Sequence, residues 1–232
     1  MSSPRPELSL TARERAVIRR CRTPAAIQQF LNRLPYNTEP PPGRATLRTF
    51  RGVIRTGTAH CLEAALTAAV IAEQHGLPPL VMSLESIDGL DHVVFVYREA
   101  GRWGSIARSR DPGLHGRRPV FRTLGALARS YHEPYIDESG LIKAYGAVDL
   151  RVLGRYDWRL ASGNVWKVEQ LLFAIPHRPS RMRADRARRL RRRFFAYKSV
   201  FPRLRPLYYD MRTWSALPAE FNRRLPPEAR PR

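Results

Sequence analysis

The segment of residues 61–75, CLEAALTAAVIAEQH, constrains the fold more than any other part of the sequence. It carries apolar side chains on nearly all sides of a helix. A helix with this pattern is buried rather than superficial. Gly76 provides a C-terminal cap, and Pro78 and Pro79 prevent the helix from continuing. The sequence therefore predicts a central helix that other elements must cover.

The segments before and after this helix in the sequence are predicted to form different secondary structure. Before it, Thr11 and the pair Thr23-Pro24 are typical N-terminal caps and predict two helices. After it, PLVMSLES predicts a strand, and DHVVFVYREAGRWGSIAR predicts two strands joined by a turn around Glu99–Arg102. Because helices are followed by a run of antiparallel strands, we expect an α+β fold in which the central helix packs on an antiparallel sheet.

The last quarter of the chain has a different composition. Residues 178–232 hold 17 Lys and Arg against 4 Asp and Glu, a net charge of +13 out of +21 for the whole chain. Apolar side chains spaced by three and four predict an amphipathic helix there with an arginine-covered outer face, capped by Ser180. Residues 218–232 are rich in proline and arginine and are typical of disorder. We therefore divide the chain into a domain of residues 1–177 and a basic C-terminal extension. Just before the boundary, a helix capped by Ser162 is expected.

The positive charge leaves two interpretations of the extension open. Of the 41 basic residues only 3 are lysines, and this preference for arginine is also typical of a GC-rich genome. The extension is then a solvated helix face. Alternatively, it docks on an anionic partner, which would be nucleic acid, a membrane surface or an acidic protein. No known base-reading motif occurs in the sequence.

The sequence also predicts the location of the protein in the cell. No run of 18 apolar residues is present, so we expect no transmembrane segment. The N-terminus lacks the apolar core of a secretory signal, and reads as a short disordered leader before the first helix. Cys21 and Cys61 alone do not suggest a disulfide framework. We therefore expect a cytoplasmic protein.

Cys61 is the candidate nucleophile, because it falls in the first turn of the central helix. The free amides and the dipole of a helix N-terminus favour a thiolate, and the backbone N–H of Cys61 itself would face a developing oxyanion. The required base is His92, which opens the strand HVVFVY and would reach the same end of the helix. A third group should orient the imidazole, and the geometry permits Ser109, Asp111 or Asp91.

These residues together resemble the core of transglutaminase-like, papain-related cysteine enzymes, and are most similar to bacterial members whose reaction is often unknown. The resemblance covers the helix-borne cysteine, the GLPP turn and the DHVVFVYREAGRWG hairpin, within about residues 55–115. It implies a papain-like fold, Cys61 as nucleophile and His92 as general base, with no metal or cofactor. Many members carry an Asp shortly after the Trp of the second strand. Here the first acid after Trp103 is Asp111. Either Asp111 serves from the loop, or another polar group does, or the triad is incomplete.

The sequence gives weaker support for a functional role of other side chains near Cys61. Glu63 is a plausible capping partner for the first turn. His60 could tune the thiol, although an adjacent residue on a helix points elsewhere. A zinc site built from His60, Cys61, Asp91 and His92 lacks the paired spacing of structural zinc sites. The side chain that completes an oxyanion hole could be Tyr36, Asn37, Gln28 or Gln29.

Two functions follow from these observations. The first is a cysteine-dependent enzyme that hydrolyses or transfers the acyl group of a peptide or other amide or ester substrate. The second is an inactive scaffold of the same fold whose basic extension binds an anionic partner. The first depends on the Cys–His pair, and the second on the charge of the extension.

Overall fold

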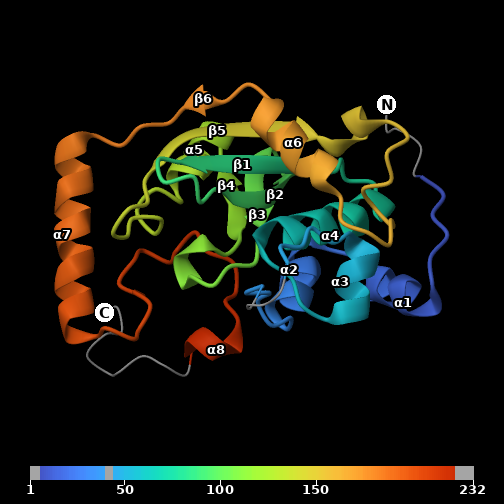
Figure 1. Cartoon of the computed structure of the whole chain (residues 1–232), viewed down its shortest axis with the longest axis horizontal. Coiled ribbons are helices and arrows are strands. Elements are labelled where there is room, and N and C mark those ends of the chain that lie inside the picture. Colours follow the sequence, from blue (N-terminus) through green and yellow to red (C-terminus); the bar gives the residue numbers. More distant parts are fainter. Residues whose placement is uncertain (1–5, 40–43, 223–232) are drawn as a thin grey trace.

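Figure 1 shows the computed structural model, which describes residues 6–39 and 44–222. Within these ranges the helices are α1 (Ala12–Arg20), α2 (Pro24–Asn32), α3 (Phe50–Thr56), α4 (Cys61–Gln74), α5 (Leu124–Arg129), α6 (Trp166–Ala174), α7 (Ala184–Val200) and α8 (Ala219–Asn222). The strands are β1 (Leu80–Ser86), β2 (His92–Glu99), β3 (Arg102–Ile106), β4 (Arg117–Phe121), β5 (Ile142–Asp149) and β6 (Arg178–Pro179). Two 3-10 helices, η1 (Pro112–Leu114) and η2 (Leu150–Leu153), lie in loops. The α+β prediction is confirmed.

The strands form one antiparallel sheet in the order β4-β3-β2-β1-β5-β6. Strands β1 to β4 follow one another as antiparallel neighbours, and β5 pairs with the other side of β1. The predicted turn between β2 and β3 is present, with Ala100 and Gly101 both at positive φ. This topology places the start of β2, where His92 opposes Leu84 of β1, near the middle of the sheet.

Both faces of the sheet are covered, because successive side chains of a strand point to opposite sides. In β2, Val93 and Phe95 belong to the core that contains α4, whereas Val94 and Val96 pack with α5 on the other face. Helix α4 lies between the sheet and α2 and α3, and every residue from Leu62 to Glu73 is buried. The predicted central helix is therefore confirmed, including its position inside the fold.

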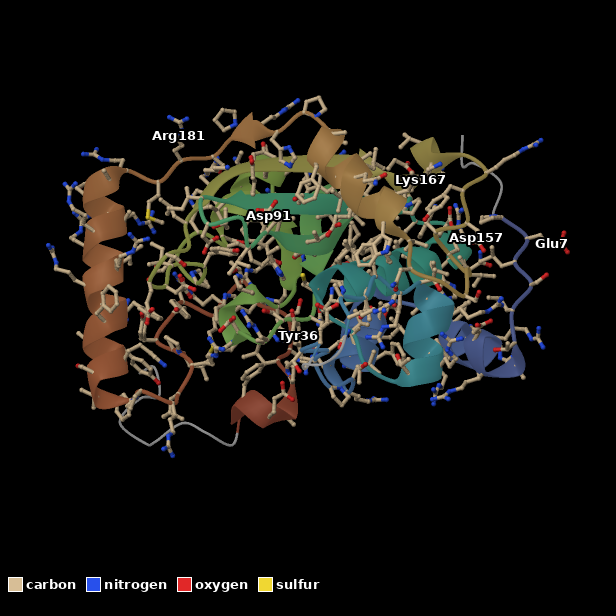
Figure 2. All side chains as sticks on the ribbon, viewed as in Figure 1. Glu7, Tyr36, Asp91, Asp157, Lys167 and Arg181 are labelled. Carbon is tan, nitrogen blue, oxygen red and sulfur yellow. The ribbon has the colours of Figure 1, made fainter. Side chains whose placement is uncertain are left out.

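The basic extension is joined to the sheet at both edges. Strand β6 pairs with β5 at one edge, and Trp214 forms an antiparallel bridge with Arg117 of β4 at the other. Between them α7 runs down the side of the molecule (Figure 1). Figure 2 shows Arg181 pointing away from the body, whereas Tyr36 lies within it. Binding of an anionic partner by the outward arginines stays a prediction.

Two predicted helix starts are wrong, and tertiary contacts explain both. Helix α6 begins at Trp166 rather than after Ser162, because Asn164 and Val165 are hydrogen-bonded to the backbone of Leu47. Helix α7 begins at Ala184 with no side-chain cap. The predicted cap Ser180 instead donates its N–H to Lys143 O and contacts His132 through its hydroxyl, which keeps the chain extended.

The predicted disorder after residue 217 is wrong for its first residues, since Ala219–Asn222 forms α8. Residues 223–232 of that segment, residues 1–5 of the predicted leader and residues 40–43 lie outside the described residues. No helix within the described ranges has both the length and the hydrophobicity needed to cross a membrane.

Candidate active site

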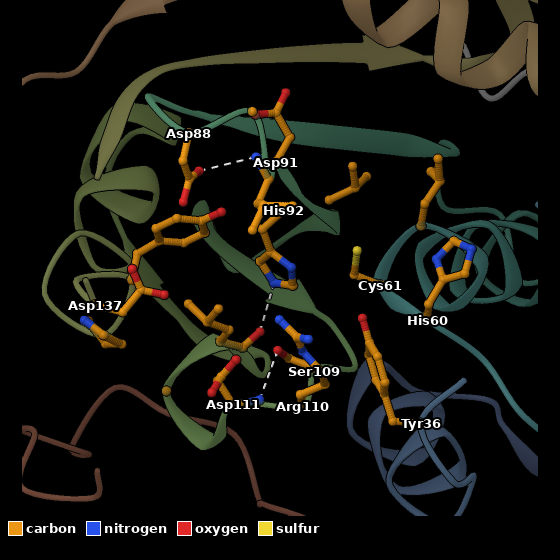
Figure 3. A pocket seen from close by; sticks show the side chains of 18 of the residues that line it. Tyr36, His60, Cys61, Asp88, Asp91, His92, Ser109, Arg110, Asp111 and Asp137 are labelled. Atoms are coloured by element: carbon orange, nitrogen blue, oxygen red, sulfur yellow. Dashed lines mark hydrogen bonds between the residues drawn. The ribbon is translucent and has the colours of Figure 1, made fainter. Parts of the chain in front are cut away.

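A cleft of about 740 Å³ opens at the N-terminus of α4, and Cys61, His60 and His92 line it. Its walls come from distant parts of the chain. They include the loops after β1 and β3, the segment between α5 and β5, helix α6, and the extension. Figure 3 shows the imidazoles of His60 and His92 on opposite sides of the Cys61 side chain. The structure thus brings the predicted nucleophile and the predicted base to one cavity.

His60 is placed beside the sulfur because it precedes the helix. It is the N-cap of α4 and has an extended backbone, with φ −88° and ψ −178°. The prediction that its ring points elsewhere assumed a helical position and is wrong. His60 Nε2 donates a hydrogen bond to Thr46 O at 2.8 Å, which leaves Nδ1 for Cys61.

Each of these groups shifts the pKa of the other. Burial opposes the charge on His60, but interactions with the Cys61 thiolate, the Glu63 carboxylate and the Thr46 carbonyl raise the pKa of His60 to about 9. Burial likewise opposes a thiolate, yet hydrogen-bonding and charge interactions with His60 and His92 lower the pKa of Cys61 well below its usual value. At neutral pH the arrangement therefore favours a thiolate next to an imidazolium.

A buried ion pair fixes the first turn of α4. The Glu63 side chain is 0% exposed and accepts hydrogen bonds from the Arg48 guanidinium at 2.6 and 2.7 Å. It also accepts from Thr46 Oγ1 at 2.9 Å and from the His60 N–H at 3.1 Å, as a helix cap does. Burial alone would raise the pKa of Glu63, but Arg48 and the charge of His60 lower it to about 2. The predicted capping role of Glu63 is confirmed.

His92 is oriented by a main-chain carbonyl. Its buried ring donates from Nε2 to Leu114 O at 2.8 Å, and it packs against Tyr131 at 6.0 Å between ring centroids. Because a neutral imidazole carries one N–H, this bond fixes the proton on Nε2 and leaves Nδ1 as the acceptor. Nδ1 is thus the nitrogen available to the Cys61 thiol.

The three residues predicted as orienting groups make other contacts. Asp111 lines the cleft, but its carboxylate forms an ion pair with Arg205 at 2.9 Å. Ser109 Oγ accepts the N–H of Asp111, and the Asp91 carboxylate accepts the N–H of Ser86. Asp111 instead begins the η1 turn that leads to Leu114. Sequence reasoning had no signal for the Leu114 carbonyl, since every residue carries one.

Of the four candidates for the oxyanion side chain, Tyr36 is the one aimed at Cys61 (Figure 3). A bridge between Tyr36 and Ala59 holds it next to the start of α4, with its hydroxyl near the Cys61 backbone N–H. Burial, and then the Cys61 charge, raise the pKa of the phenol, so it remains an O–H donor. The others differ: Asn37 binds Glu63 and Thr46, Gln28 binds the backbone of Ala107, and Gln29 is exposed.

The charge of the cleft differs from that of the whole chain. Three Lys and Arg side chains line it, which are Arg110, Lys198 and Arg205. Seven carboxylates line it, which are Glu39, Asp88, Asp91, Asp111, Asp137, Glu138 and Glu169. In a chain with a net charge of +21, this cleft is therefore not a site for a polyanion. Among the described residues, no three or more His, Cys, Asp or Glu side chains are grouped to hold a metal ion.

Comparisons with known proteins add little to this geometry. No family model matches the chain, and no curated protein matches it. Among solved structures, LapG of Legionella pneumophila matches with a TM-score of 0.33 and 13% sequence identity, over 58% of this chain and 73% of that chain. The resemblance to transglutaminase-like enzymes stays a prediction.

Proposed function

We propose that this protein is a cysteine-dependent hydrolase or acyltransferase of transglutaminase-like type, acting on an amide or ester carbonyl with Cys61 as nucleophile and His92 as general base and acid. One observation carries the proposal: Cys61 lies at the N-terminus of a buried helix, between two imidazoles, in a cleft large enough for a substrate. A small buried cysteine with a purely structural role needs none of these features.

The first half of the reaction forms an acyl-enzyme. Cys61 gives its thiol proton to His92 Nδ1, and the resulting thiolate attacks the carbonyl carbon, so that a C–S bond forms and the carbonyl electrons move onto oxygen. The backbone N–H of Cys61 and the hydroxyl of Tyr36 donate to this oxyanion. The tetrahedral intermediate then collapses, and the bond to the leaving amine or alcohol breaks as His92 Nδ1 gives it a proton. The product is a thioester on Cys61.

The second half releases the acyl group. Water, or an amine in the transfer reaction, attacks the thioester carbon while His92 Nδ1 takes its proton. The C–S bond breaks, and the sulfur leaves as the thiolate that His60 stabilises. Throughout, the Leu114 carbonyl holds His92 Nε2–H, which is the part played by the third member of a triad. The prediction from the sequence that Asp111 is the third member stays a prediction. In the present proposal the Leu114 carbonyl has that role, and Asp111 contributes by starting the turn that presents Leu114.

Iodoacetamide labelling tests the pair directly. At pH 6 we expect Cys61 to be alkylated at least about tenfold faster than a free model thiol, because a thiol of ordinary pKa is almost fully protonated there. His92→Ala should slow the labelling about fivefold. Peptide mapping by mass spectrometry measures the rates, and Cys61→Ser checks that buried Cys21 takes no label. A rate equal to that of the model thiol, unchanged by His92→Ala, would contradict the proposal and favour the inactive scaffold.

Tyr36→Phe separates oxyanion stabilisation from thiolate reactivity. Acylation of Cys61 by p-nitrophenyl acetate passes through a tetrahedral oxyanion, whereas alkylation by iodoacetamide does not. We therefore expect the variant to acylate about tenfold more slowly and to alkylate at the wild-type rate. Stopped-flow release of nitrophenolate and mass-spectrometric labelling give the two rates. Equal slowing of both reactions would mean that Tyr36 acts on the structure of the site and not on the oxyanion.

A further inference from the structure

Arg117 is a fully buried cation whose position calls for an explanation. Its residue is 0% exposed, and no carboxylate among the described residues pairs with it. Placing a charge in a protein interior is costly unless its hydrogen-bonding groups are all engaged. Burial lowers the pKa of Arg117 to about 10, so the guanidinium remains charged at neutral pH. Because burying this charge costs free energy, we expect the guanidinium to have a structural role, such as fixing the groups to which it donates hydrogen bonds.

The groups that Arg117 holds are main-chain carbonyls on both sides of Leu114. Its Nη2 donates to Gly113 O at 2.6 Å, and its Nη1 donates to His115 O at 2.8 Å. Its Nε donates to Ser130 Oγ at 3.2 Å. The guanidinium therefore clamps the residue before and the residue after Leu114. Between these two carbonyls, the Leu114 carbonyl is the one that faces His92 at 2.8 Å.

The guanidinium is itself held by two aromatic rings. Its central carbon lies 4.0 Å from the ring centroid of Tyr131 and 5.1 Å from that of Trp214. Tyr131 also donates from its hydroxyl to His115 O at 3.0 Å, so it supports the same loop. Trp214 comes from the C-terminal extension. Beside it, Ser215 donates its N–H to Gly116 O at 3.0 Å.

We propose that Arg117 is a positioning residue that holds the Leu114 carbonyl against His92, and that Trp214 of the C-terminal extension holds Arg117 in turn. This inference rests on the proposed function, since it concerns how the general base is oriented. A guanidinium-clamped main-chain carbonyl then does what the side chain of an Asp or Asn does in a Cys–His–Asp site. It follows that Trp214 gives the extension a role in the active site, beyond that of a charged appendage.

The test measures how much His92 accelerates the alkylation of Cys61, in the presence of Arg117 and in the Arg117→Lys variant. In otherwise wild-type protein, His92→Ala should slow iodoacetamide alkylation about fivefold. Arg117→Lys keeps the charge but lacks the fork that holds two carbonyls at once. In that background we expect His92→Ala to change the rate by less than about twofold, because His92 is already misplaced. The pH profile of Arg117→Lys should resemble that of His92→Ala.

Arg159→Lys is the matched control. Arg159 is also largely buried and lies over the Trp158 ring at 4.2 Å, but it pairs with Glu73 near the C-terminal end of α4, away from Cys61. In this control the full effect of His92→Ala should persist. Thermal unfolding of each variant confirms folding. If Arg117→Lys does not fold, Trp214→Leu replaces it, with Trp214→Phe as the conservative variant that restores the His92 effect.

The outcomes separate the two proposals. If His92→Ala already has no effect in otherwise wild-type protein, the proposed function fails and this inference falls with it. If His92→Ala slows the reaction equally with and without the Arg117 clamp, the proposed function stands and the positioning role is overturned. The same holds if Arg159→Lys removes the His92 effect as completely as Arg117→Lys does, because the loss is then a general consequence of disturbing a buried arginine.

Discussion

Glu63→Gln is expected to lower the free energy of unfolding by about 3 kcal/mol at pH 7. The pKa of Glu63 is about 2 in the folded protein against 4.5 in the reference state, and each pKa unit corresponds to about 1.4 kcal/mol. Glutamine keeps the shape but leaves the guanidinium of Arg48, whose side chain is 14% exposed, without its counter-charge. Urea unfolding followed by circular dichroism measures the difference.

The same variant has a characteristic pH dependence. Because the folded pKa of Glu63 is depressed, its stabilisation is present above about pH 4.5 and is lost as the pH falls toward about 2. The gap between wild type and Glu63→Gln should therefore close over this window. Asp149→Asn breaks an exposed ion pair with Arg151 and serves as control, with an expected change below about 1 kcal/mol. If Glu63→Gln also changed the free energy of unfolding by less than about 1 kcal/mol at pH 7, the stabilising role of the Glu63–Arg48 ion pair would be contradicted.

His60→Ala is expected to slow the alkylation of Cys61 on the order of 50-fold at pH 6, because the imidazolium that stabilises the thiolate is gone. The pKa of His60 is about 9, so in the wild type its charge is present throughout the neutral range. Removing that charge raises the pKa of Cys61, and the pH–rate profile for iodoacetamide should shift to higher pH. Above about pH 9, where His60 loses its proton in the wild type, the two rates should converge.

Two further variants show whether charge or contact is responsible. His60→Gln keeps a hydrogen-bond donor next to the sulfur without the positive charge, and should recover part of the lost rate. His75→Ala removes an imidazole at the other end of α4, where it donates to Ile18 O, and should leave the profile unchanged. If His60→Ala keeps the wild-type profile, the thiolate is stabilised by the helix terminus and His92 alone.

Local patterns predicted the scaffold of the site well. Apolar side chains on nearly all sides of residues 61–75 predicted a buried helix, and Gly76 and the prolines after it predicted where that helix ends. Capping threonines at positions 11 and 23 located α1 and α2, where each side chain accepts a backbone N–H of the first turn. These features depend on residues within a few positions of one another, so sequence spacing contains them.

Predictions failed where a distant segment competes with a local signal. Ser162 and Ser180 are good caps by residue type, but hydrogen bonds of the neighbouring residues to Leu47 and Lys143 keep both segments out of a helix. For His60, the prediction that its ring points away from Cys61 applies helical geometry to a residue that precedes the helix as its N-cap. The extended backbone of this N-cap position turns the ring toward the sulfur (Figure 3).

The sequence by itself determined that this chain is an α+β protein with a cysteine at the start of a buried helix and a histidine at the start of the neighbouring strand. Only the tertiary structure decided which atom orients that histidine. The acceptor is the carbonyl of Leu114, one of many identical carbonyls, and the group that clamps its loop is Arg117, one of 38 arginines. Side-chain type carries no information about such contacts, because the path of the loop, and not the chemistry of the residue, brings these atoms together.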